Sequence, residues 1–319
     1  MKNRIKNSLP GPLSMLLSNL RNGIQNTADR SKRRSLKVAG RAGEALKYSL
    51  VRPRTYYNFV VVSPERNAGA AGRKCLQSVY EQDYDKSRVR HIFIDDASID
   101  DTPERIKTWM KEHPDNTIEL IENREQCRLL ANLVKGFDMA SPGSIVIELD
   151  GDDWLPDKNV LKFLNKVYQK DNVWMTYNTF IRLISHSYTE FPNMMPVPER
   201  VIKDNSFRNY KWQTSHLHSF RKELYQNIDK KYFIEPESGF YWSCAVDHAL
   251  YLPMLELAGW HSRHIYRIMY IYNFHENSLE NTDKERQRQS AQKIRQMPPL
   301  QPLEELSGPA GENWKGEKT

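Results

Sequence analysis

Short apolar runs rich in β-branched residues alternate with longer segments of helical spacing through the first half of the chain. The runs of strand character cover 58–63, 90–95, 117–123 and 144–150. The segments of helical periodicity between them cover 69–82, 101–113 and 127–140. Such alternation is typical of an α/β fold, in which a mostly parallel central sheet carries helices on both faces.

The second half of the chain is less regular. It predicts helices and strands in the order helix 159–170, strand 173–184, helix 219–228, helix 245–259 and strand 263–274. Beyond residue 281 the sequence is polar and rich in Pro and Gly, which predicts a flexible tail over 281–319. We therefore expect one α/β domain over 55–280, between that tail and an N-terminal extension over 1–54.

Charge sets the N-terminal extension apart from the rest of the chain. The formal net charge of the 319 residues is +7, and residues 2–54 hold about a dozen Lys and Arg against Asp29 and Glu44. Apolar residues at helical spacing in the same segment predict that it is partly helical. Three interpretations fit this segment: a solvated leader, a contact for an anionic membrane surface, or a contact for nucleic acid.

The sequence favours a protein that does not cross a membrane. It has no run of about 18 apolar residues, and its first twenty residues lack the features of a secretory signal. Cys75, Cys127 and Cys244 are odd in number and widely spaced, so we expect reduced, buried thiols. These features predict a cytoplasmic protein, with peripheral contact at the membrane as an alternative.

Carboxylates gather where two of the predicted strands end. Asp95 and Asp96 close the second run, and Asp150, Asp152 and Asp153 close the fourth. Open parallel sheets bind ligands at the carboxyl ends of their strands, and clustered carboxylates repel one another unless a cation or hydrogen-bond donors neutralise them. A hard divalent ion bound together with substrate phosphates would do so. The alternative is an Asp-rich turn that caps the next helix.

The order of these motifs resembles the family 2 glycosyltransferases, which have the GT-A fold. The motifs are VVVSPERN, SVYEQDY, HIFIDDASIDDT, LLANLVKGFDMA and IVIELDGDDWL. The resemblance covers about 58–178 and reaches 278 through weaker motifs. It implies a metal-dependent, inverting transfer of a sugar from a nucleotide diphosphate donor, with UDP as the favoured nucleotide, to a hydroxyl of a glycan or lipid-linked acceptor. Residues 55–155 would form the nucleotide-sugar-binding half and 156–280 the acceptor half.

The resemblance also implies roles for individual residues on the donor side. The positions for the nucleotide sugar are Pro64, Glu65 and Asp96 near the base, Asp150 near the ribose, and Arg128 and Asn132 on a helix that faces the donor. Asp152 would bind Mn²⁺ or Mg²⁺, whereas Asp153 would be a structural capping carboxylate. Many family members have Tyr-Asn where this chain has Glu65-Arg66-Asn67, so the base contacts of this loop can differ. For Arg128, a solvated helix position is an equal alternative.

On the acceptor side, the resemblance implies that Asp247 takes the proton of the attacking hydroxyl. Asp247 opens the predicted helix 245–259, and a helix N-terminus favours a negative charge. An ordinary helix-end carboxylate is the alternative, with Glu235 and Glu237 as reserve candidates for the base. His275 matches a late position that approaches the metal, although it can equally be an ordinary loop residue.

His216 and His218 alternate as in a strand but have no third ligand nearby in the sequence, so we predict no zinc site there. Other functions remain open. The basic extension is compatible with a transferase that modifies bases in DNA. A nucleotidyltransferase is less favoured because HIFIDDASIDDT does not belong to its pattern, and a glycan-binding module would not need both Asp150 and Asp152.

Overall fold

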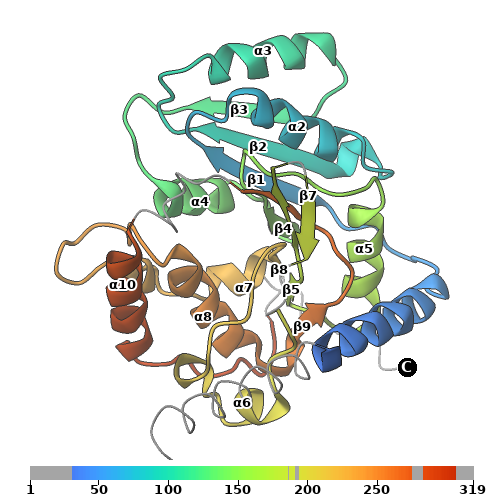
Figure 1. Ribbon diagram of the computed structural model, residues 1–319, viewed down its shortest axis with the longest axis vertical. Coiled ribbons are helices and arrows are strands. Elements are labelled where there is room, and N and C mark those ends of the chain that lie inside the picture. The colour runs from blue at the N-terminus through green and yellow to red at the C-terminus, as the bar shows by residue number, and fades with distance from the viewer. Residues whose placement is uncertain (1–30, 186, 191–193, 275–282, 307–319) are drawn as a thin grey trace, which may run out of the picture.

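The structure is a computed structural model that describes residues 31–185, 187–190, 194–274 and 283–306. Within this part, a seven-stranded sheet has the order β3-β2-β1-β4-β8-β5-β9 (Figure 1). Its strands are β1 (Phe59–Glu65), β2 (Val89–Asp95), β3 (Ile118–Glu122), β4 (Ile145–Glu148), β5 (Met175–Asn178), β8 (Ser219–Arg221) and β9 (Ser262–Ile265). All neighbours pair in parallel except β8, which is antiparallel to β4 and β5. The predicted α/β fold with a mostly parallel sheet is confirmed.

Helices cover both faces of this sheet (Figure 1). They are α2 (Gly69–Tyr80), α3 (Thr102–Glu112), α4 (Leu129–Asp138), α5 (Val160–Lys170), α6 (Glu199–Lys203), α7 (Lys222–Gln226), α8 (Val246–Ala258) and α10 (Lys284–Gln296). Alternate residues of β1 separate the two faces, as the pleat of a strand requires. Phe59 and Val61 are buried with α2 and α5, whereas Val60 and Val62 are buried with α4 and α8.

Close contact between α4 and β1 depends on Gly136. A Cβ atom at this position would lie 2.3 Å from Cγ1 of Val62, so any larger residue would push the helix away from the strand. The contact fixes α4 over the central strand, and the loop before α4 is thereby held near the carboxyl end of β1.

Two of the predicted strands each divide between the main sheet and a small second sheet. The segment 173–184 becomes β5 and β6 (Ile181–Ile184), and the segment 263–274 becomes β9 and β10 (Ile271–Asn273). The small sheet has the order β10-β6-β7, with β7 at Ser187–Glu190. The predicted helix 219–228 is also divided, because its first residues form β8 between β4 and β5 and only α7 is helical.

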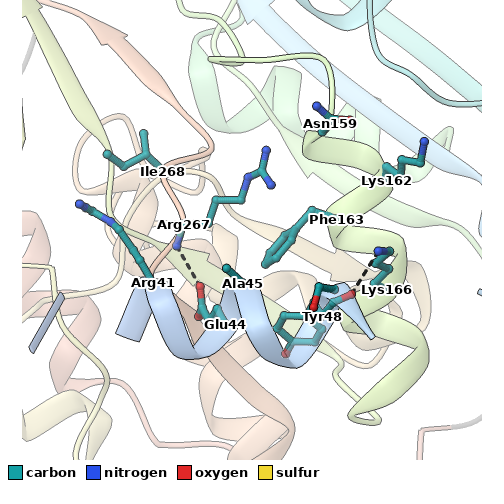
Figure 2. A pocket seen from close by; sticks show the side chains of 11 residues that line it. Arg41, Glu44, Ala45, Tyr48, Asn159, Lys162, Phe163, Lys166, Arg267 and Ile268 are labelled. Carbon is teal, nitrogen blue, oxygen red and sulfur yellow. Dashed lines mark hydrogen bonds between the residues drawn. The ribbon is translucent and has the colours of Figure 1, made fainter. Parts of the chain in front are cut away.

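The predicted N-terminal extension includes a helix over 31–49 that packs against the domain. Figure 1 shows this helix, in dark blue, beside α5. The Tyr48 hydroxyl donates a hydrogen bond of 2.6 Å to Asp171, and the buried Lys37 forms an ion pair of 2.8 Å with the half-buried Glu190 of β7. Glu44 accepts hydrogen bonds from the backbone N–H groups of the loop that follows β9 (Figure 2).

The structure corrects the prediction of a flexible tail from residue 281 for the part that it describes. Residues 284–296 form α10, and Ile294 of this helix is buried against α8. The polar sequence of α10 concealed it, because only Ser290 and Ile294 are buried along its length. A second correction concerns Cys127, which is exposed rather than buried. Among the described residues, no helix combines the length and the apolar character needed to cross a bilayer.

Candidate active site

The carboxyl end of β1 lies between the two acidic segments that the sequence singles out. The Gly151 N–H donates to the Pro64 carbonyl at 3.3 Å, which holds the turn after β4 against β1. On the other side, the Asp96 N–H donates to the Glu65 carbonyl at 2.8 Å. The parallel order β2-β1-β4 therefore brings residues from three strand ends to one edge of the sheet.

Gly151 allows the turn after β4 to approach β1 this closely. A Cβ atom at this position would lie 2.6 Å from Cβ of Glu65 and 2.9 Å from the ring of Phe93. Any other residue would therefore separate the turn from β1. The Asp-Gly-Asp sequence thus meets a steric requirement as well as supplying two carboxylates.

The carboxylates at this edge are close enough to perturb one another. Burial raises the pKa of Glu65 well above its usual range, and the charge of Asp152 and a hydrogen bond to it raise this pKa further. Burial also raises the pKa of Asp150 to about 7; His216 opposes this rise, and the charges of Glu148, Asp152 and Asp247 add to it. The Oδ1 atom of Asp150 is buried and has no hydrogen-bond partner among the residues that the structure describes. The edge therefore concentrates negative charge that its own hydrogen bonds do not fully neutralise.

Asp153 points into the protein instead. Its carboxylate accepts a hydrogen bond of 2.7 Å from the Asn273 N–H and one of 2.5 Å from the Tyr270 hydroxyl. The same hydroxyl lies 3.1 Å from an oxygen of Asp150. Asp153 thus ties the turn after β4 to the segment around β10, which fixes the orientation of the turn.

Asp96 organises the loop that leads into α4. Its carboxylate accepts hydrogen bonds from the N–H groups of Cys127 at 2.7 Å and Arg128 at 2.8 Å, and from the Asn123 side chain at 3.0 Å. Burial tends to raise the pKa of Asp96, but these donors and Asn132 outweigh it, so the pKa lies below its usual value. Asn132 is fully buried and accepts a hydrogen bond of 2.7 Å from Asn123. The side chain of Arg128 is exposed at the N-terminus of α4, outside the helix proper.

Asp247 reaches the same edge from a different element. It lies in the first turn of α8, as predicted, and its charge contributes to the raised pKa of Asp150. The loop before α8 is fixed by α10, because Gln287 accepts a hydrogen bond of 2.7 Å from the Ala245 N–H and Arg286 donates one of 2.8 Å to Ser243. The reserve carboxylates Glu235 and Glu237 instead lie 3.6 and 3.1 Å from Lys293 of α10.

A cluster that sequence reasoning did not find lies beneath the turn after β4. Glu148, His216 and His218 each offer a ligand atom within 4.8 Å of the others. His218 Nδ1 is 3.2 Å from a carboxylate oxygen of Glu148, and the hydroxyl of Tyr251 on α8 donates to the same oxygen. His216 stacks on the ring of Tyr270 with 4.6 Å between centroids.

His216 and His218 have no third ligand nearby in the sequence, but the fold brings Glu148 beside them as a candidate. Glu148 is about 70 positions away in the chain but occupies the neighbouring strand. Its signal in the sequence is one acidic residue inside the apolar run 144–150, two positions before Asp150 and at the last position of β4. The predicted metal ligand His275 lies outside the described residues.

Comparison with known proteins bears on the family and the fold of the chain. The family model for glycosyl transferase family 2 matches residues 60–236. Among solved structures, the chain is similar to S. aureus TarS 1–349, with 16% identity, a TM-score of 0.53, and coverage of 68% of this chain and 60% of that one. For TarS 1–349 in complex with UDP-GlcNAc the identity is 15% and the TM-score 0.52, with 70% and 61% covered. Among curated proteins, none matches the chain significantly.

The likeness to TarS is one of fold, and this chain spans less than two thirds of the TarS chains that it matches. It bears out the expected GT-A architecture. The family match extends over more than half of the chain and includes β1, β2 and β4, whose ends carry Glu65, Asp96, Asp150 and Asp152. The chain therefore belongs to glycosyl transferase family 2.

Proposed function

We propose that this family 2 member is a metal-dependent, inverting glycosyltransferase that moves a sugar from a nucleotide diphosphate donor to an acceptor hydroxyl. The observation that carries the proposal is the meeting of Glu65, Asp150 and Asp152 at one sheet edge, with Asp247 approaching from α8. The three carboxylates at the two strand ends are suited to bind a cation together with the phosphates of a donor. The fourth carboxylate, on a separate helix, is suited to contact an acceptor.

The donor would bind along the carboxyl ends of β1, β2 and β4. We assign the base to Pro64 and Glu65, with Arg128 and Asn132 on the same side, and the ribose to Asp150. Asp96 would contribute to nucleotide binding indirectly, by holding the loop before α4 in place, because its oxygens already accept hydrogen bonds from that loop. UDP is the nucleotide with which we would begin.

Asp152 is the residue that we assign to Mn²⁺ or Mg²⁺. The surroundings fit a hard divalent cation, because Asp150 presents a buried oxygen without a hydrogen-bond partner among the described residues and Glu65 lies beside Asp152. When bound, the cation would offset the negative charge that develops on the leaving diphosphate. Glu148, His216 and His218 form a second group able to hold a metal ion just below this edge.

Asp247 would serve as the general base. It would accept the proton of the acceptor hydroxyl while the oxygen attacks the anomeric carbon from the side opposite the diphosphate, which inverts the configuration. The N-terminus of α8 favours the ionised form that a base requires. The hydrogen bonds from α10 to the preceding loop would hold α8, and with it Asp247, at a fixed distance from the donor.

For the acceptor we propose a hydroxyl of a glycan or a lipid-linked saccharide, reached by a cytoplasmic protein that binds peripherally to the membrane. The expectation of a nucleic-acid acceptor rests on the basic N-terminal residues alone. The described part of that segment carries exposed leucine and valine side chains, which suit a lipid surface better than a phosphate backbone.

A thermal-shift screen of nucleotide sugars with and without Mn²⁺ tests the proposal. A donor at about 100 times its Kd stabilises the folded state by about 2.7 kcal/mol, which raises the Tm of a protein of this size by roughly 4 °C. Turnover should then release a nucleoside diphosphate and give a product of inverted anomeric configuration by NMR. Release of pyrophosphate would indicate a nucleotidyltransferase, and binding of glycans without any donor would indicate a binding module.

A further inference from the structure

Asp247 and Tyr251 lie four positions apart on α8, so their side chains are neighbours on the same face of the helix. Tyr251 is fully buried, and its hydroxyl donates a hydrogen bond to a carboxylate oxygen of Glu148. Glu148 is the last residue of β4, two positions before Asp150 and four before Asp152. A buried hydrogen bond therefore connects the helix that carries the proposed base to the strand whose end carries the proposed donor ligands.

His218 holds this connection from a third element. Its Nδ1 atom lies 3.2 Å from the carboxylate oxygen that accepts from Tyr251, and its ring stacks on the Tyr251 ring with 3.6 Å between centroids. Its backbone carbonyl also accepts a hydrogen bond of 3.2 Å from the Glu148 N–H. All three side chains are buried, where a hydrogen bond is stronger than in water. Tyr251 is therefore fixed both by its ring and by its hydroxyl.

The pKa of Tyr251 reflects the carboxylates around it. Burial raises this pKa well above its usual range, the charge of Glu148 and the hydrogen bond to it raise it further, and the charges of Asp247 and Asp150 add to the rise. Tyr251 therefore remains a neutral hydrogen-bond donor. It also lies near the proposed base and near the end of β4 at the same time.

Pro253 divides α8 into two parts. Proline has no N–H, so the Ala249 carbonyl cannot receive from residue 253 the hydrogen bond that a regular helix provides. The contacts that hold the C-terminal part of α8, such as the buried ion pair of Glu256, lie beyond this point. Tyr251 lies before it, on the part that carries Asp247. We therefore expect the position of Asp247 to depend more on Tyr251 than on the contacts beyond Pro253.

Other contacts of this N-terminal part lead to α10. Gln287 and Arg286 hold the loop before α8, and Arg295 lies 3.3 Å from Nε2 of His248. Packing buries eleven of the thirteen residues of α8, but the hydrophobic effect has no directional preference. The hydrogen bond to Glu148 is directional and joins α8 to β4, so it sets the distance between the helix and the strand.

We propose that Tyr251, held by Glu148 and His218, is a positioning residue that fixes Asp247 at the distance from the donor that transfer requires. The inference rests on the proposed function, because it takes Asp247 as the base and the end of β4 as part of the donor site. Tyr251 itself exchanges no proton with the substrates. Displacement of a reacting group by about 1 Å can cost about 10²-fold in rate, whereas donor affinity depends on the strand ends and should not change.

Tyr251→Phe in the full-length protein tests the proposal, because it removes the hydroxyl and keeps the ring. Calorimetric titration with UDP and Mn²⁺ measures donor-site affinity. Turnover is measured as release of UDP, with water as the acceptor, from the UDP-sugar that gives the largest shift in the thermal-shift screen. We expect kcat to fall by about 10- to 100-fold, with KM for the donor and Kd for UDP within about twofold of the wild-type values.

The matched control is Tyr225→Phe. It also removes one phenol hydroxyl, which donates a hydrogen bond of 2.8 Å to Asp138. Tyr225 belongs to α7, which follows the end of β8 that pairs with the start of β4, away from the carboxyl end of that strand. Its replacement should leave kcat unchanged, and thermal unfolding of both variants measures the stability that each hydroxyl contributes.

A second pair of variants does not depend on the folding of Tyr251→Phe. Glu148→Gln keeps an oxygen that can accept from Tyr251, whereas Glu148→Ala removes the acceptor. Glu148→Gln should therefore retain more of kcat than Glu148→Ala. The double variant Tyr251→Phe/Glu148→Ala should be no slower than the slower of the two single variants, because both substitutions remove the same contact.

A Tyr251→Phe protein with the wild-type kcat would overturn the proposal, as would an equal loss of kcat in Tyr225→Phe. Weaker UDP binding that accounts for the whole loss would also overturn it, since Tyr251 would then act on the donor site. Equal loss in Glu148→Gln and Glu148→Ala would overturn it by showing that the charge of Glu148 matters and the hydrogen bond does not. In each of these cases the wild type still turns over the donor, whereas a wild type that binds no nucleotide sugar would contradict the proposed function and this inference with it.

Discussion

Replacing Asp152 by Asn separates the stability of the carboxylate edge from its function. In the ligand-free protein Asp152 adds a negative charge beside Glu65 and near Asp150. The amide keeps the shape of the side chain but removes that charge. We therefore expect Asp152→Asn to be more stable than the wild type when metal is absent, and to lose metal-dependent donor binding.

The size of the effect follows from the geometry. Two charges about 4 Å apart near a protein surface, at an effective dielectric constant of about 20, repel by about 4 kcal/mol. Protonation relieves most of this, because the raised pKa of Glu65 lets the pair hold a proton. The remaining repulsion that the amide removes is roughly 1–2 kcal/mol, which corresponds to a rise in Tm of about 1.5–3 °C for a protein of this size.

Thermal unfolding at neutral pH measures both effects. The Tm in EDTA reports the stability of the variant without metal, and the Tm in Mn²⁺ with a nucleotide sugar reports its metal-dependent donor binding. The control is Asp115→Asn, which loses a surface ion pair of 2.5 Å with Lys86 and should change stability by less than about 0.5 kcal/mol. A variant that is less stable than the wild type in EDTA would refute the reasoning about repulsion. A variant that keeps the full metal-dependent shift in Tm would refute the assignment of the metal to Asp152.

Three further substitutions test other parts of the structure. Asp247→Asn should leave donor binding unchanged in the thermal-shift assay and lower the rate of transfer by about 10²–10⁴, and full activity would eliminate Asp247 as the base. Arg208→Met should lower the free energy of unfolding by about 3–5 kcal/mol in urea denaturation, because it leaves the buried carboxylate of Glu256 without the guanidinium that lies 2.6 and 2.9 Å from it. Gly136→Ala should destabilise by about 1–3 kcal/mol in the same assay, since the new Cβ meets Val62; the usual helix preference for Ala would give the opposite sign.

The donor half of the fold could be predicted because its signals are local. Apolar runs with acidic ends mark β2 and β4, and helical periodicity marks α2, α3 and α4. The order of the motifs then places Asp96 and Asp150 at the ends of two strands, which the structure has on either side of β1. Nothing in this reasoning requires contacts between residues far apart in the chain.

The remainder depends on long-range contacts that no local pattern reveals. The strand β8 is three residues long and owes its conformation to pairing with β4 and β5, so its helix-like sequence was misleading. The cluster of Glu148 with His216 and His218 exists only because β8 follows these histidines into the sheet beside β4. The helix α10 is polar along most of its length and is held in place by α8.

The attachment of α10 has a consequence for how this protein can vary. The match to the family ends at residue 236, whereas α8, α10 and the segment that follows lie beyond it. The Leu300 N–H donates to Glu256 at 2.9 Å and the Leu303 N–H to the Leu257 carbonyl at 3.0 Å, so the last described residues brace the helix that carries Asp247. Substitutions in these last described residues can thus shift α8, which we propose to serve the acceptor, without disturbing the strand ends that we propose to hold the nucleotide.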